Sequence, residues 1–204
     1  MSEPVSASRA PRVLAVAGSP RRGGNSDALL AACAEGVIAA GGVVDSLVVA
    51  QSGIGVCTGC NNCSKGGECT VRDGMQDVYP RIDAADAIVV ATPVYFASVP
   101  ATLKALYDRC QPYWARRYVL GRPAPERRAG ALLVVGGGGD PYGHECAVTT
   151  TRSVFAVLAL DYRHELVAEA DARSDVAAQA STLAAARAVG EAIAVEAAER
   201  LSAR

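Results

Sequence analysis

The chain has 204 residues, a formal net charge of −1, and a composition in which 50% of the residues are hydrophobic. This length suits one domain with a full core. The near-neutral charge and scattered arginines argue against a nucleic-acid-binding protein and against a polybasic membrane patch. No apolar stretch has the length of a transmembrane helix, and the first residues lack the apolar segment of a signal peptide. We therefore expect a cytoplasmic protein that binds small molecules or proteins, not nucleic acid or membranes.

Apolar runs alternate with helical patterns along the chain. After a polar tail at 1–11, which we predict to be disordered, buried strands are predicted at 12–18, 43–49, 87–92, 129–135 and 163–168. Helices are predicted at 26–40, 75–84, 100–111, 145–160 and 175–201. The segment 53–73 contains four cysteines and fits neither pattern.

Strands that alternate with helices indicate a parallel sheet covered on both faces, with right-handed crossovers. Five strands with short loops favour the flavodoxin-like, doubly wound α/β fold over the six-stranded dinucleotide-binding fold, and the expected strand order is 2-1-3-4-5. We predict a single domain over 12–204, in which the cysteine-rich loop at 53–73 is an insertion after the second strand. Ligands of such a sheet bind at the carboxyl ends of the strands.

The loop after the first strand, GSPRRGGNS at 18–26, leads into a helix N-terminus and has neither G-x-G-x-x-G nor the lysine of a P-loop. Unpaired backbone N–H groups and the helix dipole attract phosphate there. Ser19, Asn25 and Ser26 add donors, and Arg21 or Arg22 can neutralise the charge. The loop therefore favours a monophosphate site; the alternative is a glycine-rich turn with Ser26 as an ordinary N-cap.

The next unusual segment, CTGCNNCSKGGEC, spaces its cysteines as C-x2-C-x2-C-x5-C. This spacing is close to the compact run that holds a 4Fe-4S cluster, although the bacterial ferredoxin run has three residues before its last cysteine. Zinc sites more often use two separated pairs. The candidate ligands are Cys57, Cys60, Cys63 and Cys69, and zinc or a set of free thiols remain as alternatives. Cys33, Cys110 and Cys146 are interpreted as packing residues.

The loops after the third and fourth strands also carry unusual chemistry. In TPVYFASVP at 92–100, Tyr95 and Phe96 suit the face or rim of a flat heterocycle, and the alternative is that both belong to the core. GGGGDPYGHE at 136–145 lets a ligand approach the backbone closely. His144 could donate a proton, although a solvated loop histidine is the simpler interpretation, and His164 is interpreted as structural. Tyr95 and His144 are weak catalytic candidates, and no pattern identifies a catalytic group.

Three of these motifs, GSPRRGGNS, the cysteine run and TPVYFASVPATLKALYDR, occur in an order that resembles the iron-sulfur flavoprotein branch of the NADPH-dependent FMN reductases. The resemblance covers about residues 12–160 and implies a flavodoxin-like fold. It implies FMN-phosphate ligands at Ser19, Arg21, Asn25 and Ser26. For the isoalloxazine ring it implies Pro93, Val94, Tyr95 and Phe96, with Gly136, Gly137 and Gly138 on the other side. It implies that the four cysteines carry a 4Fe-4S cluster, and that Lys104, Asp108 and Arg109 are structural. One departure is Gly74, where the family often has an acid.

The resemblance further implies an FMN-dependent oxidoreductase that passes electrons between NAD(P)H or ferredoxin, a 4Fe-4S cluster, FMN and a small-molecule acceptor. It also implies a homodimer or homotetramer. Three alternatives remain at this stage. They are an NAD(P)H:FMN or quinone reductase without a cluster, a non-enzymatic flavodoxin-like electron carrier, and a flavin-binding domain with a structural zinc module.

Overall fold

The computed structural model describes residues 9–170 and 175–203. Its centre is a five-stranded parallel sheet in the order β2-β1-β3-β4-β5, which confirms the predicted flavodoxin-like topology. The strands are β1 (Arg12–Ala17), β2 (Val43–Val48), β3 (Ala87–Pro93), β4 (Arg128–Gly136) and β5 (Leu160–Glu169). The α-helices are α1 (Asn25–Ala39), α2 (Cys63–Gly66), α3 (Met75–Ala84), α4 (Ala101–Asp108), α5 (Gln111–Tyr118), α6 (Glu145–Val157) and α7 (Ala180–Ser202). Two 3-10 turns are η1 (Val49–Gln51) and η2 (Asp175–Ala178).

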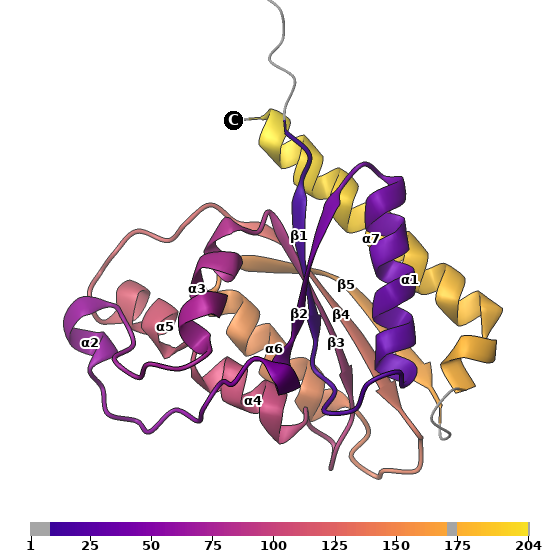
Figure 1. Ribbon diagram of the computed structural model, residues 1–204, viewed down its shortest axis with the longest axis horizontal. Coiled ribbons are helices and arrows are strands. Elements are labelled where there is room, and N and C mark those ends of the chain that lie inside the picture. Colours follow the sequence, from indigo (N-terminus) through magenta and orange to yellow (C-terminus); the bar gives the residue numbers. More distant parts are fainter. Residues whose placement is uncertain (1–8, 171–174, 204) are drawn as a thin grey trace, which may run out of the picture.

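Helices cover both faces of the sheet, and each face has its own apolar core (Figure 1). Alternate residues of a strand point to opposite faces, so neighbours in β1 serve different cores. Leu14 belongs to the core formed with α3, α4 and α6, whereas Val13 belongs to the core formed with α1 and α7. Because both faces are buried, the central strands are continuous apolar runs rather than alternating ones.

Glycines allow α1 and α7 to cross in close contact. A Cβ at Gly36 would lie 2.0 Å from the carbonyl oxygen of Arg187, and a Cβ at Gly190 would lie 1.9 Å from that of Cys33. Both distances are far below van der Waals contact, so neither position can hold a larger residue unless the helices separate. The pair explains why two glycines occur inside otherwise regular helices.

Four predicted elements have the wrong bounds. The helix predicted at 100–111 is two helices, because α4 ends at Asp108 and α5 starts at Gln111. The helix predicted at 145–160 ends at Val157, and β5 starts at Leu160 rather than at residue 163. The helix predicted at 175–201 is the turn η2 followed by α7, separated at Gln179, whose side chain donates to the Glu169 carbonyl.

Residues 1–8 of the predicted disordered tail lie outside the described residues. The next residues contact the sheet: Arg9 donates to both carboxylate oxygens of Asp86, at 2.6 and 2.7 Å. The carbonyl of Pro11 accepts a hydrogen bond from the Val43 N–H at 2.8 Å. These contacts fix the start of β1 next to β2 and β3. Within the described part of the chain, no helix has both the length and the apolar character needed to span a membrane.

Candidate functional site

The loops after β1, β3 and β4 lie side by side at the carboxyl edge of the sheet, in the lower part of Figure 1. The register pairs Ala17 with Ala91 and Pro93 with Val135, so the three strands end close to one level. The Gly18 N–H donates to the Ala91 carbonyl, and the Val94 N–H donates to the Val135 carbonyl. The three loops with unusual chemistry therefore share one edge of the molecule.

The loop after β1 ends at an N-terminus that no side chain caps. Gly24, not Ser26, is the N-cap of α1, so the interpretation of Ser26 as an ordinary N-cap is wrong. Ser26 is buried in the first turn, and Ser19 is buried with its Oγ accepting the Arg21 N–H at 3.1 Å. The Asn25 side chain accepts the Val176 N–H at 3.2 Å and so also contacts η2. An uncapped N-terminus leaves first-turn N–H groups for a ligand.

The loop after β3 is a tight turn with an outward-pointing aromatic side chain. Tyr95 and Ser98 exchange backbone hydrogen bonds at 2.8 and 3.1 Å, and between them Phe96 and Ala97 have φ of +50° and +60°. Positive φ is unfavourable for non-glycine residues. Phe96 is 100% exposed, so the interpretation of this residue as core is wrong. Tyr95 is 36% exposed.

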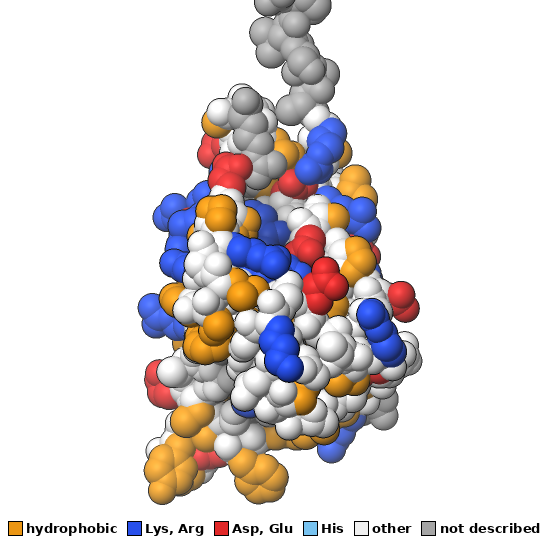
Figure 2. Space-filling view, turned by 90° about the vertical axis from the view of Figure 1, so that its left-hand side faces the viewer, with side chains coloured by type: hydrophobic (Ala, Val, Ile, Leu, Met, Phe, Trp, Pro, Cys, Tyr) orange, Lys and Arg blue, Asp and Glu red, His pale blue; other side chains and the backbone are white. Residues whose placement is uncertain are grey.

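The loop after β4 adds flexible backbone and a further aromatic group at the same edge. Gly138, Gly139 and Gly143 have positive φ, and Tyr142 is exposed. His144 is partly exposed at the N-cap position of α6, where its side chain makes no capping hydrogen bond. Figure 2 shows hydrophobic side chains protruding at this lower end of the molecule. His164 lies elsewhere, with Nε2 2.8 Å from a Glu196 carboxylate oxygen, as expected for a structural residue.

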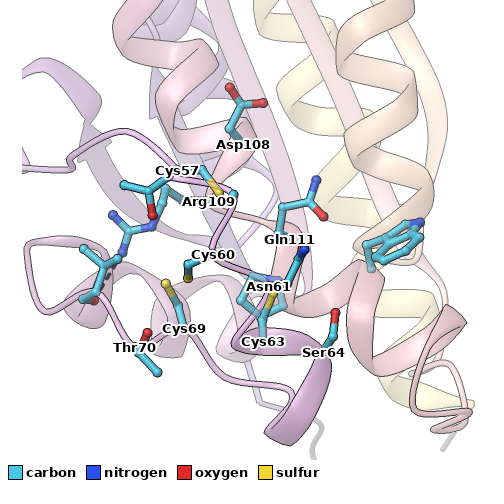
Figure 3. A pocket seen from close by; sticks show the side chains of 15 residues that line it. Cys57, Cys60, Asn61, Cys63, Ser64, Cys69, Thr70, Asp108, Arg109 and Gln111 are labelled. Carbon is cyan, nitrogen blue, oxygen red and sulfur yellow. Dashed lines mark hydrogen bonds between the residues drawn. The ribbon is translucent and has the colours of Figure 1, made fainter.

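The four predicted metal ligands line one cavity of about 350 Å³ beside α5 (Figure 3). Left-handed backbone at Gly59 and Asn61 coils the chain between the first three cysteines, and α2 starts at Cys63. Such φ values are natural for glycine and tolerated by asparagine. Figure 3 shows Cys60 and Cys69 pointing toward one another. Within residues 9–170 and 175–203, no three His, Cys, Asp or Glu side chains converge closely enough to coordinate a single ion.

The thiols of the cavity are electrostatically distinct. Hydrogen bonds to its sulfur, first from the Asn62 backbone N–H and then from the Thr58 and Thr70 side chains, lower the pKa of Cys60. The pKa of Cys63 is raised, first by burial and then by the negative charge of the other three thiolates. Four thiolates in one cavity therefore repel one another, and cationic ligands bound between them would relieve that repulsion.

A buried ion pair closes the two ends of the cysteine loop. The Arg109 guanidinium donates to both carboxylate oxygens of Asp73, at 2.5 and 3.0 Å. It also donates to the carbonyls of Gly55 and Val71, at 3.1 and 3.3 Å. The hydrogen bonds from Arg109 lower the pKa of Asp73 to about 2. Residues before and after the cysteines are thus tied to one side chain, which we call the Arg109 clasp.

No side chain fits at Gly74, the residue that follows Asp73 of the Arg109 clasp. A Cβ at Gly74 would lie 1.5 Å from the Ser52 carbonyl oxygen. The chain leaving the cysteine loop passes so close to the chain entering it that no side chain fits. The acid often found here in the resembled family cannot be accommodated in this backbone.

Helix α5, which the sequence analysis missed, forms a wall of the cavity through Gln111, Pro112 and Trp114. Arg116 of this helix donates to the Gly67 carbonyl at 2.7 Å, and Arg122 donates to the Gly66 carbonyl at 2.8 Å. Both carbonyls lie at the C-terminal end of α2, where cations are favourable. The arginines therefore fix α2 against α5, next to the cysteines.

The residues of the K-x3-DR pattern, Lys104, Asp108 and Arg109, form ion pairs, as expected. Lys104 pairs with Asp108 at 2.7 Å, and Arg109 pairs with Asp73. Of the other cysteines, Cys33 and Cys110 are buried, and burial raises the pKa of each thiol to about 12. Cys146 is exposed on α6, so its interpretation as a packing residue is wrong.

Comparison with known proteins gives a consistent result. The sequence model of the family described as NADPH-dependent FMN reductase matches residues 11–172. An iron-sulfur flavoprotein of Archaeoglobus fulgidus is 32% identical over 64% of this chain and 57% of its own length. One of Methanocaldococcus jannaschii is 32% identical over 72% of this chain and 71% of its own. The chain thus spans less than two thirds of the Archaeoglobus relative.

Solved structures show the same fold. A flavodoxin from the domain Archaea superposes with a TM-score of 0.57 at 12% identity, over 91% of this chain and 98% of that chain. At this identity the likeness concerns the fold alone. It agrees with the flavodoxin-like strand order of the sheet.

Proposed function

Because the chain belongs to the NADPH-dependent FMN reductase family, we propose that it is an FMN-dependent oxidoreductase that also carries an iron-sulfur cluster. The proposal rests on the presence of two features in the same fold. Three ligand-type loops lie at the carboxyl edge of the sheet, and four cysteines line one cavity beside it. Bound FMN would supply one- and two-electron chemistry, and a 4Fe-4S cluster would supply one-electron transfer.

The loop after β1 is the proposed phosphate site. First-turn N–H groups of α1, together with Ser19, Asn25 and Ser26, would donate to the phosphate. Arg21 is exposed beside them and would neutralise charge. The ring system would lie against the loop after β3, with Pro93, Val94, Tyr95 and Phe96. The backbone at Gly136, Gly137 and Gly138 would cover its other side. His144 and Tyr95 are candidate proton donors at this edge, and we propose no further catalytic role for them.

The cysteine cavity suits a cluster better than a single zinc ion. Zinc sites more often use two separated pairs of cysteines, whereas the run C-x2-C-x2-C-x5-C is compact. A cluster of four irons presents a separate iron to each thiolate and fills a larger volume, in keeping with a cavity of about 350 Å³. Cys57, Cys60, Cys63 and Cys69 would be the ligands.

We propose NAD(P)H or ferredoxin as electron donor and a small molecule as acceptor. Trp114 and Tyr118 are exposed on α5 beside Arg116 and Arg117, and Figure 2 shows several Lys and Arg side chains, with Asp and Glu among them, in the upper part of the face that it views. Such a face suits a negatively charged carrier protein. The cysteine loop and the loops at the carboxyl edge come from different segments of the chain, and α2 of the cysteine loop lies to one side of the sheet in Figure 1. A homodimer or homotetramer could bring the cluster of one subunit to the flavin of another.

Steady-state kinetics separate an enzyme from an electron carrier. The FMN-loaded protein is mixed with NADH or NADPH and a quinone, and oxidation of the nicotinamide is followed by absorbance. We expect turnover that saturates with the quinone, because a substrate-binding site limits the rate. A rate that stays linear in quinone concentration, or no oxidation with either nicotinamide, would support a carrier instead. Repeating the assay with reduced ferredoxin identifies the donor.

A further inference from the structure

Arg109 is the largest fully buried side chain, with 1% of its surface exposed, and it lines the cysteine cavity. In the Arg109 clasp, its Nη1 and Nη2 groups donate hydrogen bonds to the Asp73 carboxylate and to the carbonyls of Gly55 and Val71. Its Nε–H has no hydrogen-bond partner among the described residues. A buried donor without an acceptor destabilises the folded protein. An acceptor bound in the cavity would remove this cost.

We propose that Arg109 is a positioning residue that donates from Nε to a sulfur atom at the cysteine site and thereby raises the reduction potential of the cluster. This inference rests on the proposed function, because it requires that a cluster is bound. The clasp holds both ends of the loop, so the guanidinium is fixed with respect to the cysteines before any metal enters.

The acceptor follows from what shares the cavity with Arg109. Cys69 lines the same cavity, and the Tyr79 hydroxyl fixes the backbone of Arg109 by donating to its carbonyl at 2.7 Å. Cys69 Sγ, or a cluster sulfide next to it, is therefore the candidate acceptor. The other charged side chain lining the cavity is Asp108, which is paired with Lys104.

The direction of the effect follows from charge. Reduction adds an electron to the cluster, and a donor or positive charge next to a sulfur stabilises the more negative state. The carboxylate of Asp73 partly cancels the charge of the guanidinium. Removal of the Nε donor should lower the potential, and removal of the carboxylate should raise it.

The test is a redox titration of the purified cluster-loaded protein, followed by electron paramagnetic resonance. Arg109→Lys keeps a positive charge but loses Nε and the planar fork. We expect the ratio of reduced to oxidised cluster at a fixed ambient potential to fall about tenfold, which is about 59 mV for one electron. The matched control is Arg128→Lys. Arg128 is also a buried arginine, and it donates to the carbonyls of Ile82, Ala85 and Leu158 at the other end of the sheet.

An Arg128→Lys protein with the wild-type potential, together with a lowered potential in Arg109→Lys, supports the proposal. An unchanged potential in Arg109→Lys overturns it. If Arg109→Lys does not retain iron, the same redox titration is made on Asp73→Asn. A raised reduction potential in that variant supports the proposal, and an unchanged or lowered potential overturns it. A wild-type protein without iron and sulfide would refute the proposed cluster itself, and the inference with it.

Discussion

Two neighbouring arginines in the loop after β1 have different surroundings. Arg22 pairs with Asp27 at 3.3 Å, and the Gly23 N–H donates to the same carboxylate at 2.7 Å, so Arg22 belongs to the start of α1. Arg21 is exposed, and its guanidinium makes no ion pair or hydrogen bond among the described residues. Arg21 is thus the side chain that can turn to a phosphate without losing a partner.

Arg21→Ala should weaken FMN binding about tenfold or more, because a charge-assisted hydrogen bond contributes about 1.5–3 kcal/mol. Riboflavin, which lacks the phosphate, should bind nearly as well to the variant as to the wild type. Fluorescence titration of the flavin-free protein measures both. Arg22→Ala is the matched control and should affect the two flavins equally. Equal losses for FMN and riboflavin in Arg21→Ala would mean that Arg21 does not contact the phosphate.

At the residue scale, the sequence predicted which residue types gather at each loop, but not how they are paired. The four cysteines were predicted from spacing alone, and they do line one cavity. The Arg109 clasp was not predicted, because Arg109 and Asp73 are 36 residues apart and only tertiary structure brings them together. From the sequence, Gly74 could be noted only as a departure from the pattern of the resembled family. The reason for the glycine is the close approach of the Ser52 carbonyl, which no local sequence pattern predicts.

At the scale of elements, strand order was predictable because long apolar runs and the right-handed crossover rule leave few topologies. Some of the wrongly predicted boundaries lack the residues that usually mark the end of a helix. Helix α6 ends at Val157, and Ala159, just after its C-cap, has φ +54°, a conformation for which glycine is the usual signal. Helix α5 carries Pro112 in its first turn, which could have indicated a new helix start.

The close contact between α1 and α7 predicts that a larger residue at Gly190 lowers the free energy of unfolding. Gly190→Ala places a methyl group against the Cys33 carbonyl, so the helices must separate, and we expect a loss of about 1–3 kcal/mol in the free energy of unfolding. Urea denaturation followed by circular dichroism measures it. Gly66→Ala is the control, since nothing lies within 4 Å of its Cβ position. A stability of Gly190→Ala equal to that of the control would contradict this close contact.

At the scale of the whole molecule, the two candidate cofactor regions use separate parts of the chain. The phosphate loop joins β1 to α1, whereas the cysteine cavity is built by the segment between β2 and α3 together with α5 (Figure 1). The insertion therefore adds a second candidate cofactor site outside the sheet. This separation was predictable from the order of the motifs, but the part played by α5 was not.

The most direct test is to count flavin, iron, acid-labile sulfide and zinc in anaerobically purified wild-type protein and in Cys60→Ser. We predict one FMN, four irons and four sulfides per wild-type chain. In Cys60→Ser we predict loss of iron and sulfide with FMN retained, because the two sites use different loops. About one zinc per chain without acid-labile sulfide, or loss of FMN together with iron in Cys60→Ser, would contradict the account.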